Sequence, residues 1–313
     1  MSIVYIVIGL TLLVFGGNWL LKAAVGLSLK LNIPKIVIGM TVVSFATSAP
    51  ELIVSIKSAL EGATGLAVGN VIGSNIANLA LVLAITVILS PIQVEKSFYT
   101  TDWPIMMIAS AMLYCFIAYD HTIQTYEGVI LFITLLLFLI YLLRFQKQAV
   151  VDEMPEDDEA LPVPKIIFFL IIGGFGLWGG SELLINGSVT LAKSLAVSDA
   201  VIGVTIVSVG TSIPELAASI VAVLKKEKAI SLGNLIGSNV FNILAVLGIT
   251  SIITPVYVKK EAVSLINHDI FWMLAISFVI LPLVFIPKSK KLSWRDGLLL
   301  LGAYATFIYL TIV

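Results

Sequence analysis

The sequence predicts an all-α membrane protein in which ten transmembrane helices form two inverted five-helix repeats with broken core helices. Three observations predict this fold class. The 313 residues are 59% hydrophobic and only 12% charged, whereas soluble domains carry about 25% charged residues. The two halves share a polar motif at a fixed offset of 164 residues, and each half contains five long apolar segments. An odd number of spans in each repeat places the second copy upside down in the bilayer.

The expected spans follow from length and hydropathy, because a transmembrane helix needs about 20 mostly apolar residues. The ten segments are 3–29, 36–60, 66–90, 103–119, 126–144, 165–192, 199–223, 229–254, 269–286 and 294–312. We therefore expect a first five-helix repeat at 1–146, an acidic linker at 147–163 and a second, inverted repeat at 164–313. The linker carries six acidic residues without the spacing of an EF-hand calcium loop, so we interpret it as a solvated connection.

The distribution of Lys and Arg predicts the orientation. If the N-terminus lies outside, thirteen of these residues fall in inside connections and four fall in outside connections. This excess satisfies the positive-inside rule. Both termini are then expected outside, and the linker is expected in the cytoplasm.

The repeat is an internal duplication. The offset holds without a gap from Gly39/Gly203 to Pro91/Pro255, and 25 of these 53 aligned positions are identical. Shared hydrophobicity would match Leu, Ile and Val, but the matches here include polar residues. The identical polar pairs include Thr47/Thr211, Ser48/Ser212, Glu51/Glu215, Asn70/Asn234, Ser74/Ser238, Asn75/Asn239 and Asn78/Asn242.

Each copy contains a proline inside an apolar segment, in TSAPE (47–51) and TSIPE (211–215). Proline cannot donate a backbone hydrogen bond, and it favours the first turn of a helix after a Ser or Thr cap. We therefore expect one half-helix to end near Ala46 or Gly210 and a new one to begin near the proline. Broken backbone at membrane depth is tolerated only where it is buried or lines a cavity.

These breaks predict a cluster of oxygen ligands. The hydroxyl and carboxylate ligands expected there are Thr47, Ser48, Glu51, Thr211, Ser212 and Glu215. Oxygen ligands suit Ca²⁺ and Na⁺ and do not suit zinc or copper. Proline kinks beside hydroxyls are common in membrane helices, but a charged side chain at the bilayer centre costs about 2.5–3.5 kcal/mol on insertion scales. Two symmetry-related glutamates therefore indicate function.

A second motif follows in each copy, GNVIGSNIAN (69–78) and GNLIGSNVFN (233–242). Residues four apart share a helix face, which groups Ser74 with Asn78, and Ser238 with Asn242. We expect these four side chains to complete the oxygen shell. Their neighbours Asn75 and Asn239 are expected to point elsewhere and to tie helices together. The glycines allow close helix packing.

A third acid, Glu182, lies in the sixth expected span and has no acidic counterpart in the first repeat. We interpret it as a buried acid with either a helix-pairing role or a place at the entrance of an ion path. Cys115 is the only cysteine, so no disulfide framework or thiolate metal site forms within one chain.

The motifs GMTVVSFATSAPE…GNVIGSNIAN and GVTIVSVGTSIPE…GNLIGSNVFN resemble the alpha repeats of the calcium/cation antiporter superfamily, above all its prokaryotic sodium/calcium exchanger group. The resemblance implies a core of the second, third, seventh and eighth spans, past which the first and sixth spans slide. It also implies a prokaryotic plasma (inner) membrane. Glu51 and Glu215 would be the central Ca²⁺ ligands, helped by the carbonyls of Thr47 and Thr211.

The resemblance also implies Na⁺ sites. Their ligands would be the hydroxyls of Ser48, Ser74, Ser212, Ser238, Thr47 and Thr211, with carbonyls near Ser44 and Ser208. Sodium/calcium exchangers of this family often have Asp at the position of Asn242, and the potassium-dependent branch ties that acid to K⁺. Asn242 therefore argues against K⁺ dependence and leaves two central carboxylates, which balance one Ca²⁺.

We therefore expect a secondary active antiporter that exchanges Na⁺ for Ca²⁺ by alternating access, with both ions as transported substrates. We expect no catalytic activity, no cofactor, no nucleic-acid partner and no obligatory protein partner. Other interpretations stay open: exchange of Ca²⁺ or another divalent cation for H⁺ carried by the glutamates, or a passive cation channel. An intramembrane enzyme has weak support, because no His or Asp pair accompanies a nucleophile.

Overall fold

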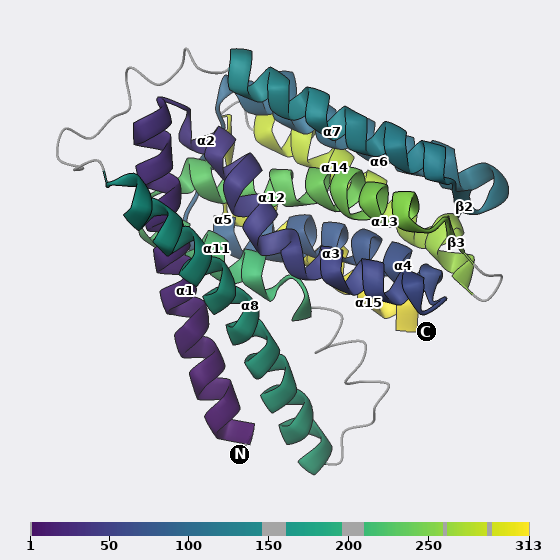
Figure 1. The fold of residues 1–313 in the computed structure, drawn as a ribbon, viewed down its shortest axis with the longest axis horizontal. Coiled ribbons are helices and arrows are strands. Elements are labelled where there is room, and N and C mark those ends of the chain that lie inside the picture. The colour runs from purple at the N-terminus through teal and green to yellow at the C-terminus, as the bar shows by residue number, and fades with distance from the viewer. Residues whose placement is uncertain (1, 146–160, 196–209, 259–261, 287–289, 313) are drawn as a thin grey trace. The chain divides into compact units, whose positions relative to one another are not determined.

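The computed structural model describes residues 2–145, 161–195, 210–258, 262–286 and 290–312 (Figure 1). The described residues form helices joined by short turns and four two-residue strands. The prediction of an all-α chain is therefore confirmed for this part of the sequence. The chain divides into two compact units, one within 1–47 and 141–235 and the other within 48–140 and 236–311. Each unit combines segments from both halves of the sequence.

The first unit contains α1 (Ser2–Leu31), α2 (Lys35–Ile38), the π-helix η1 (Gly39–Val43), α8 (Val163–Ser194) and α11 (Ile213–Leu224). The second contains α4 (Thr64–Ala77), η2 (Asn78–Val82), α5 (Leu83–Leu89), η3 (Phe98–Asp102), α6 (Trp103–Asp120), η6 (Asn242–Leu247), α13 (Gly248–Ile253), η8 (Leu265–Asp269), α14 (Ile270–Phe285) and most of α15 (Trp294–Ile312). Three helices contribute to both units: α3 (Ser44–Leu60), α7 (Thr125–Phe145) and α12 (Lys228–Phe241).

Eight helical segments in the described residues are long and apolar enough to cross a membrane. They are Ser2–Leu31, Lys35–Leu60, Thr64–Leu89, Phe98–Asp120, Thr125–Arg144, Val163–Ser194, Lys228–Ile253 and Leu265–Phe285. The first part of the expected span 199–223, residues 199–209, lies outside the described residues, and the rest contains the shorter helix α11. The expected span 294–312 is the helix α15, which is not among the eight. The count of ten stays a prediction.

Glycines hold α1 against α8 along their length in the first unit (Figure 1). A Cβ atom built on Gly16 would lie 2.7 Å from the backbone nitrogen of Leu177. A Cβ atom on Gly173 would lie 2.6 Å from the backbone nitrogen of Leu20. Backbone therefore touches backbone at these crossings, as small residues allow between membrane helices. A larger side chain on either glycine has no space.

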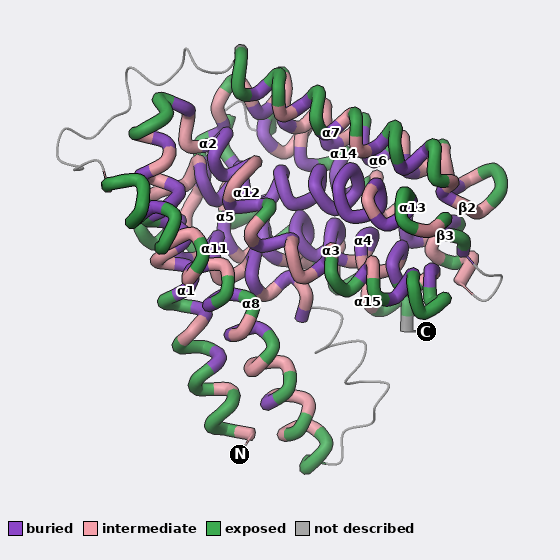
Figure 2. The backbone as a smooth tube through the Cα atoms, viewed as in Figure 1, coloured by how far each residue is buried: buried purple, intermediate pink, exposed green. Residues whose placement is uncertain are grey.

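The second unit is built around the two segments that contain the sequence Gly-Ser-Asn, at residues 73–75 and 237–239. Every residue from 230 to 248 is buried, and so is every residue from 74 to 80. Figure 2 shows these stretches of α12 with η6, and of α4 with η2, as the most continuously buried parts of the chain. In contrast, α7 exposes large apolar side chains such as Leu137 and Ile140. An exposed apolar face is expected where a helix contacts lipid.

Two short antiparallel ribbons in the second unit each pair one strand from each half of the sequence. The strand β1 (Ile92–Gln93) pairs with β4 (Lys291–Leu292), and β2 (Thr122–Ile123) pairs with β3 (Val256–Tyr257). The hydroxyl of Thr64, at the start of α4, donates to the carbonyl of Tyr257, which follows α13. The segments α4–α5 and η6–α13 therefore run in opposite directions, as Figure 1 also shows.

The predicted break near Ala46 is wrong. The helix α3 continues through Pro50 without interruption, and the irregular backbone lies upstream in the π-helix η1. Ser44 Oγ lies 2.8 Å from the carbonyl oxygen of Gly39, which also accepts the backbone N–H of Ser44 in this wider turn. A proline inside a helix removes the hydrogen bond to the carbonyl four residues earlier, and membrane helices tolerate this loss where neighbouring groups satisfy that carbonyl. The proline is accommodated here without ending the helix.

The second copy does start a new helix at its proline. The helix α11 begins at Ile213, with Ser212 at the cap position and Pro214 in the first turn. The predicted start is therefore confirmed. The residues immediately before Gly210, where the preceding half-helix was expected, lie outside the described part of the chain.

Candidate ion-binding site

Glu51 and Glu215 are both fully buried, with 0% of their surface exposed. Glu51 lies within α3, one residue after Pro50. Glu215 lies in the first turn of α11, at the positive end of the helix dipole. A carboxylate removed from water is costly unless it is paired, hydrogen-bonded or bound to a cation. Two such residues at equivalent positions mark the motif as a candidate ion site.

The start of α3 is tied to α12 in the first unit through Asn234. Ser44 Oγ lies 2.9 Å from the carbonyl oxygen of Asn234. Thr47 Oγ1 lies 3.2 Å from the side-chain oxygen Oδ1 of the same residue. The amide nitrogen of Asn234 in turn lies 3.3 Å from Ser219 Oγ, one helical turn after Glu215. One asparagine therefore positions hydroxyls of the first motif and the helix that carries the second glutamate.

One bond of this arrangement recurs in the second unit, at positions 164 residues earlier. The amide nitrogen of Asn70 lies 3.1 Å from Ser55 Oγ and 3.4 Å from the carbonyl oxygen of Glu51. The bond from Asn70 to Ser55 is thus the counterpart of the bond from Asn234 to Ser219. These two bonds of Asn70 support α3 directly beside the first glutamate.

Four asparagines link α4 and η2 to α12 and η6. The side-chain amide of Asn75 donates to the carbonyl of Asn239, and the side-chain amide of Asn239 donates to the carbonyl of Asn75, both at 3.2 Å. Asn78 donates to Asn239 Oδ1, and Asn242 donates to Asn75 Oδ1, both at 3.1 Å. The expectation that Asn75 and Asn239 tie helices together is confirmed.

This network fixes the side-chain oxygens of Asn78 and Asn242. Each residue uses its amide nitrogen in the bonds just described, so its Oδ1 is the atom that remains for another ligand. Both oxygens are buried, and neither has a hydrogen-bond partner among the described residues. An unsatisfied buried acceptor costs about 1–3 kcal/mol. A bound cation would remove that cost at both positions.

The remaining predicted ligands are also in protected positions. Ser48, Ser74, Ser212 and Ser238 are buried, whereas Thr211 is half-buried. The hydroxyl of Ser212 has no hydrogen-bond partner within the described ranges. Ser208 lies outside the described residues.

The structure brings the predicted ligands together in two groups. Ser44 and Thr47 meet at Asn234 in the first unit, and Asn78 and Asn242 meet through the asparagine network in the second. Glu51 and Glu215 belong to different compact units. Their convergence on one cation therefore stays a prediction.

Two features differ from what was inferred from the sequence. No role was predicted for Asn70, Asn234, Ser55 and Ser219, although each pair is identical in the two copies and polar within an apolar segment. That combination was the signal for a supporting shell. Glu182 was interpreted as buried, but its side chain on α8 is exposed. Hydropathy averages over a whole helix and does not say which face a single acid occupies.

Comparisons with known proteins agree with these features. The model of the family described as sodium/calcium exchanger protein matches residues 1–144 and 165–313. The inner membrane protein YrbG of Escherichia coli is 32% identical over 314 residues, which cover 97% of this chain and 94% of that protein. The sodium/calcium exchanger MaX1 of Methanosarcina acetivorans is 29% identical over 345 residues, covering 97% and 96% of the two chains.

The fold is also similar to a solved structure. The sodium-calcium exchanger NCX_Mj, soaked with zero Na⁺ and Ca²⁺, superimposes with a TM-score of 0.82 at 29% identity, covering 99% of this chain and 98% of that one. The resemblance to prokaryotic sodium/calcium exchangers is thereby confirmed. The chain is a multi-pass integral membrane protein and belongs to the sodium/calcium exchanger protein family.

Proposed function

We propose that this protein is a secondary active antiporter that exchanges Na⁺ for Ca²⁺ across the membrane by alternating access. The observation that carries this proposal is the pair of fully buried glutamates, Glu51 and Glu215, at equivalent positions of a duplicated motif. Membership of an exchanger family supports it. Buried acids of membrane helices generally mark ion pathways.

The transported ions would share one set of oxygen ligands. Glu51 and Glu215 would bind Ca²⁺ with the carbonyls of Thr47 and Thr211, and the same glutamates would help to bind Na⁺. The other proposed ligands are the hydroxyls of Ser48, Ser74, Ser212, Ser238, Thr47 and Thr211, the side-chain oxygens of Asn78 and Asn242, and carbonyls near Ser44 and Ser208. Hydroxyl, amide and carboxylate oxygens suit Ca²⁺.

Charge balance explains why the two loads would exclude each other. Two carboxylates neutralise one Ca²⁺, and Na⁺ ions in the same pocket compete for the same oxygens. An empty site would leave two anions in a low-dielectric region, which is strongly unfavourable. The loaded site therefore crosses the apolar barrier more readily than the empty one, and this difference couples the two fluxes.

The same proposal includes the inverted repeat, with halves at 1–146 and 164–313 joined by the linker 147–163. The antiparallel course of α4–α5 and η6–α13 supports it, as do the two ribbons that pair strands from opposite halves. We place the linker in the cytoplasm and both termini outside, in a prokaryotic inner membrane, from the distribution of Lys and Arg.

Flux through the purified protein in sealed proteoliposomes tests the proposal. Vesicles loaded with Na⁺ should take up ⁴⁵Ca²⁺ when diluted into Na⁺-free buffer, and vesicles without a Na⁺ gradient should not. Uptake that occurs only after a pH jump would show that the counter-ion is H⁺ and not Na⁺. Uptake that needs no counter-ion, together with single-channel currents, would instead establish a passive channel.

A further inference from the structure

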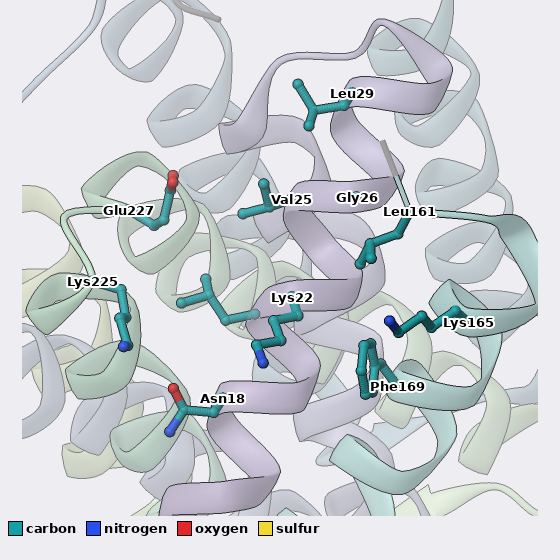
Figure 3. A pocket seen from close by; sticks show the side chains of 11 residues that line it. Asn18, Lys22, Val25, Gly26, Leu29, Leu161, Lys165, Phe169, Lys225 and Glu227 are labelled. Carbon is teal, nitrogen blue, oxygen red and sulfur yellow. The ribbon is translucent and has the colours of Figure 1, made fainter. Parts of the chain in front are cut away.

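A cavity of about 460 Å³ lies in the first unit and is lined by the ends of three helices (Figure 3). Its walls come from the last turns of α1, the first turns of α8 and the residues that follow α11. The orientation predicted from Lys and Arg places all three of these helix ends at the cytoplasmic side of the membrane.

The cavity is strongly basic. Lys22, Lys165 and Lys225 line it, and all three are exposed. Glu227 also lines it, but its carboxylate forms a 2.9 Å ion pair with Lys35 and so is already neutralised. Three positive charges therefore remain in one concave site. Figure 3 shows Lys22 between Lys225 on one side and Lys165 on the other.

Two of these ammonium groups lie near the same aromatic ring. Lys22 Nζ lies 5.7 Å from the centroid of the Phe169 ring, and Lys165 Nζ lies 5.8 Å from the same centroid. Cation–π attraction acts at this range. This attraction holds two like charges near each other without requiring an anion. An anion bound between them would relieve their repulsion.

Apart from Asn18, the rest of the wall is mostly apolar. Val25 and Leu29 from α1 and Leu161 before α8 line the cavity beside the lysines (Figure 3). A free inorganic anion would use the ammonium groups and leave this surface uncovered. An amphiphile with a phosphate head would use both. Basic pockets between membrane helices on the cytoplasmic side bind anionic lipid head groups for this reason.

We propose that this cavity binds one anionic phospholipid, with its phosphate among Lys22, Lys165 and Lys225 and an acyl chain entering the membrane past Phe169, one turn beyond Lys165 on α8. The site is separate from the proposed ion ligands, so its occupancy does not depend on which ions are transported. The lipid joins the ends of α1, α8 and α11 at the membrane surface.

Native mass spectrometry of the full-length protein tests this site with phosphatidylglycerol, phosphatidylcholine and inorganic phosphate as separate probes. The wild type should retain one phosphatidylglycerol in preference to phosphatidylcholine. The triple variant K22Q/K165Q/K225Q should bind phosphatidylglycerol at least tenfold more weakly, because each basic residue near an anionic head group contributes to binding. The control K57Q/K96Q/K291Q removes the same charge from exposed lysines elsewhere and should bind like the wild type.

Three results would overturn the proposal. They are unchanged phosphatidylglycerol binding by the triple variant, equal retention of phosphatidylcholine by the wild type, and displacement of phosphatidylglycerol by equimolar inorganic phosphate. The melting temperature of each variant in detergent checks its fold. If the triple variant does not fold, K165Q alone is measured, since Lys165 is exposed in the first turn of α8. A fall in melting temperature without any change in lipid binding would assign the lysines to contacts within the chain.

Discussion

At the residue scale, the protein places acids and amides where apolar side chains are the rule, and it fixes their orientation with other amides. Asn234 and Asn70 each reach a serine one helical turn beyond a glutamate. Asn75 and Asn239 exchange bonds across two helices and direct the amide nitrogens of their neighbours. Supporting hydrogen bonds of this kind keep ligand oxygens in place when no ion is bound.

The first prediction concerns the glutamates. Glu51→Gln and Glu215→Gln keep the shape of the side chain but remove its charge, so each variant should lose Na⁺-driven ⁴⁵Ca²⁺ uptake to background. Glu61→Gln, in the exposed turn after α3, is the matched control and should transport like the wild type. Size-exclusion profiles and melting temperatures establish that the variants fold. Wild-type flux in both glutamine variants would remove the site assignment.

A second prediction tests the asparagine network. Asn75→Ala removes the donor to the Asn239 carbonyl and the acceptor for the Asn242 amide. Leaving buried polar groups without partners should cost about 1–3 kcal/mol, and the melting temperature in detergent should fall. Asn186→Ala changes an exposed asparagine on α8 and should leave the melting temperature unchanged. Equal melting temperatures for the two variants would mean that the network contributes nothing to stability.

At the element scale, the glycines of α1 and α8 permit backbone contact over several turns of both helices. Such an interface lacks interlocking large side chains. In the expected mechanism α1 and α8 slide together past the core spans, and this close backbone contact keeps the two helices together as one pair. The packing of α12 against α2 uses the same device, since a Cβ atom on Gly233 would lie 2.3 Å from the carbonyl oxygen of Ile36.

The third prediction compares neighbouring glycines on one helix. Gly173→Ala should lower the melting temperature, because its Cβ atom would lie 2.6 Å from the backbone of Leu20 and overpacking costs about 1–3 kcal/mol. Gly174→Ala is the control, because nothing lies within 4 Å of its Cβ position. Alanine has a higher helix propensity than glycine, so this contribution would raise the stability of both variants equally. A Gly173→Ala protein as stable as Gly174→Ala would show that the α1–α8 contact tolerates separation.

At the scale of the whole molecule, hydropathy and the repeat predicted the helical class, most span boundaries and the residues worth examining. They did not predict the continuous helix through Pro50, because that outcome depends on whether neighbouring groups satisfy the carbonyl of Ala46, four residues before the proline. They also did not predict the exposed face of Glu182, or the bond from Asn234 to Ser219. These features arise from tertiary packing, which local composition does not encode.

The final prediction concerns topology. An inverted repeat requires an odd number of membrane spans in each half of the chain. In a Cys115→Ala background, single cysteines are introduced as Ser2→Cys, Gln148→Cys and Val313→Cys. A membrane-impermeant maleimide should label Ser2→Cys and Val313→Cys in right-side-out vesicles, and Gln148→Cys in inside-out vesicles. Labelling of Ser2→Cys and Gln148→Cys from the same side would mean an even number of spans before the linker. The two copies of the motif would then share one orientation, and Glu51 and Glu215 could not face each other across a pseudo-twofold axis in the membrane plane.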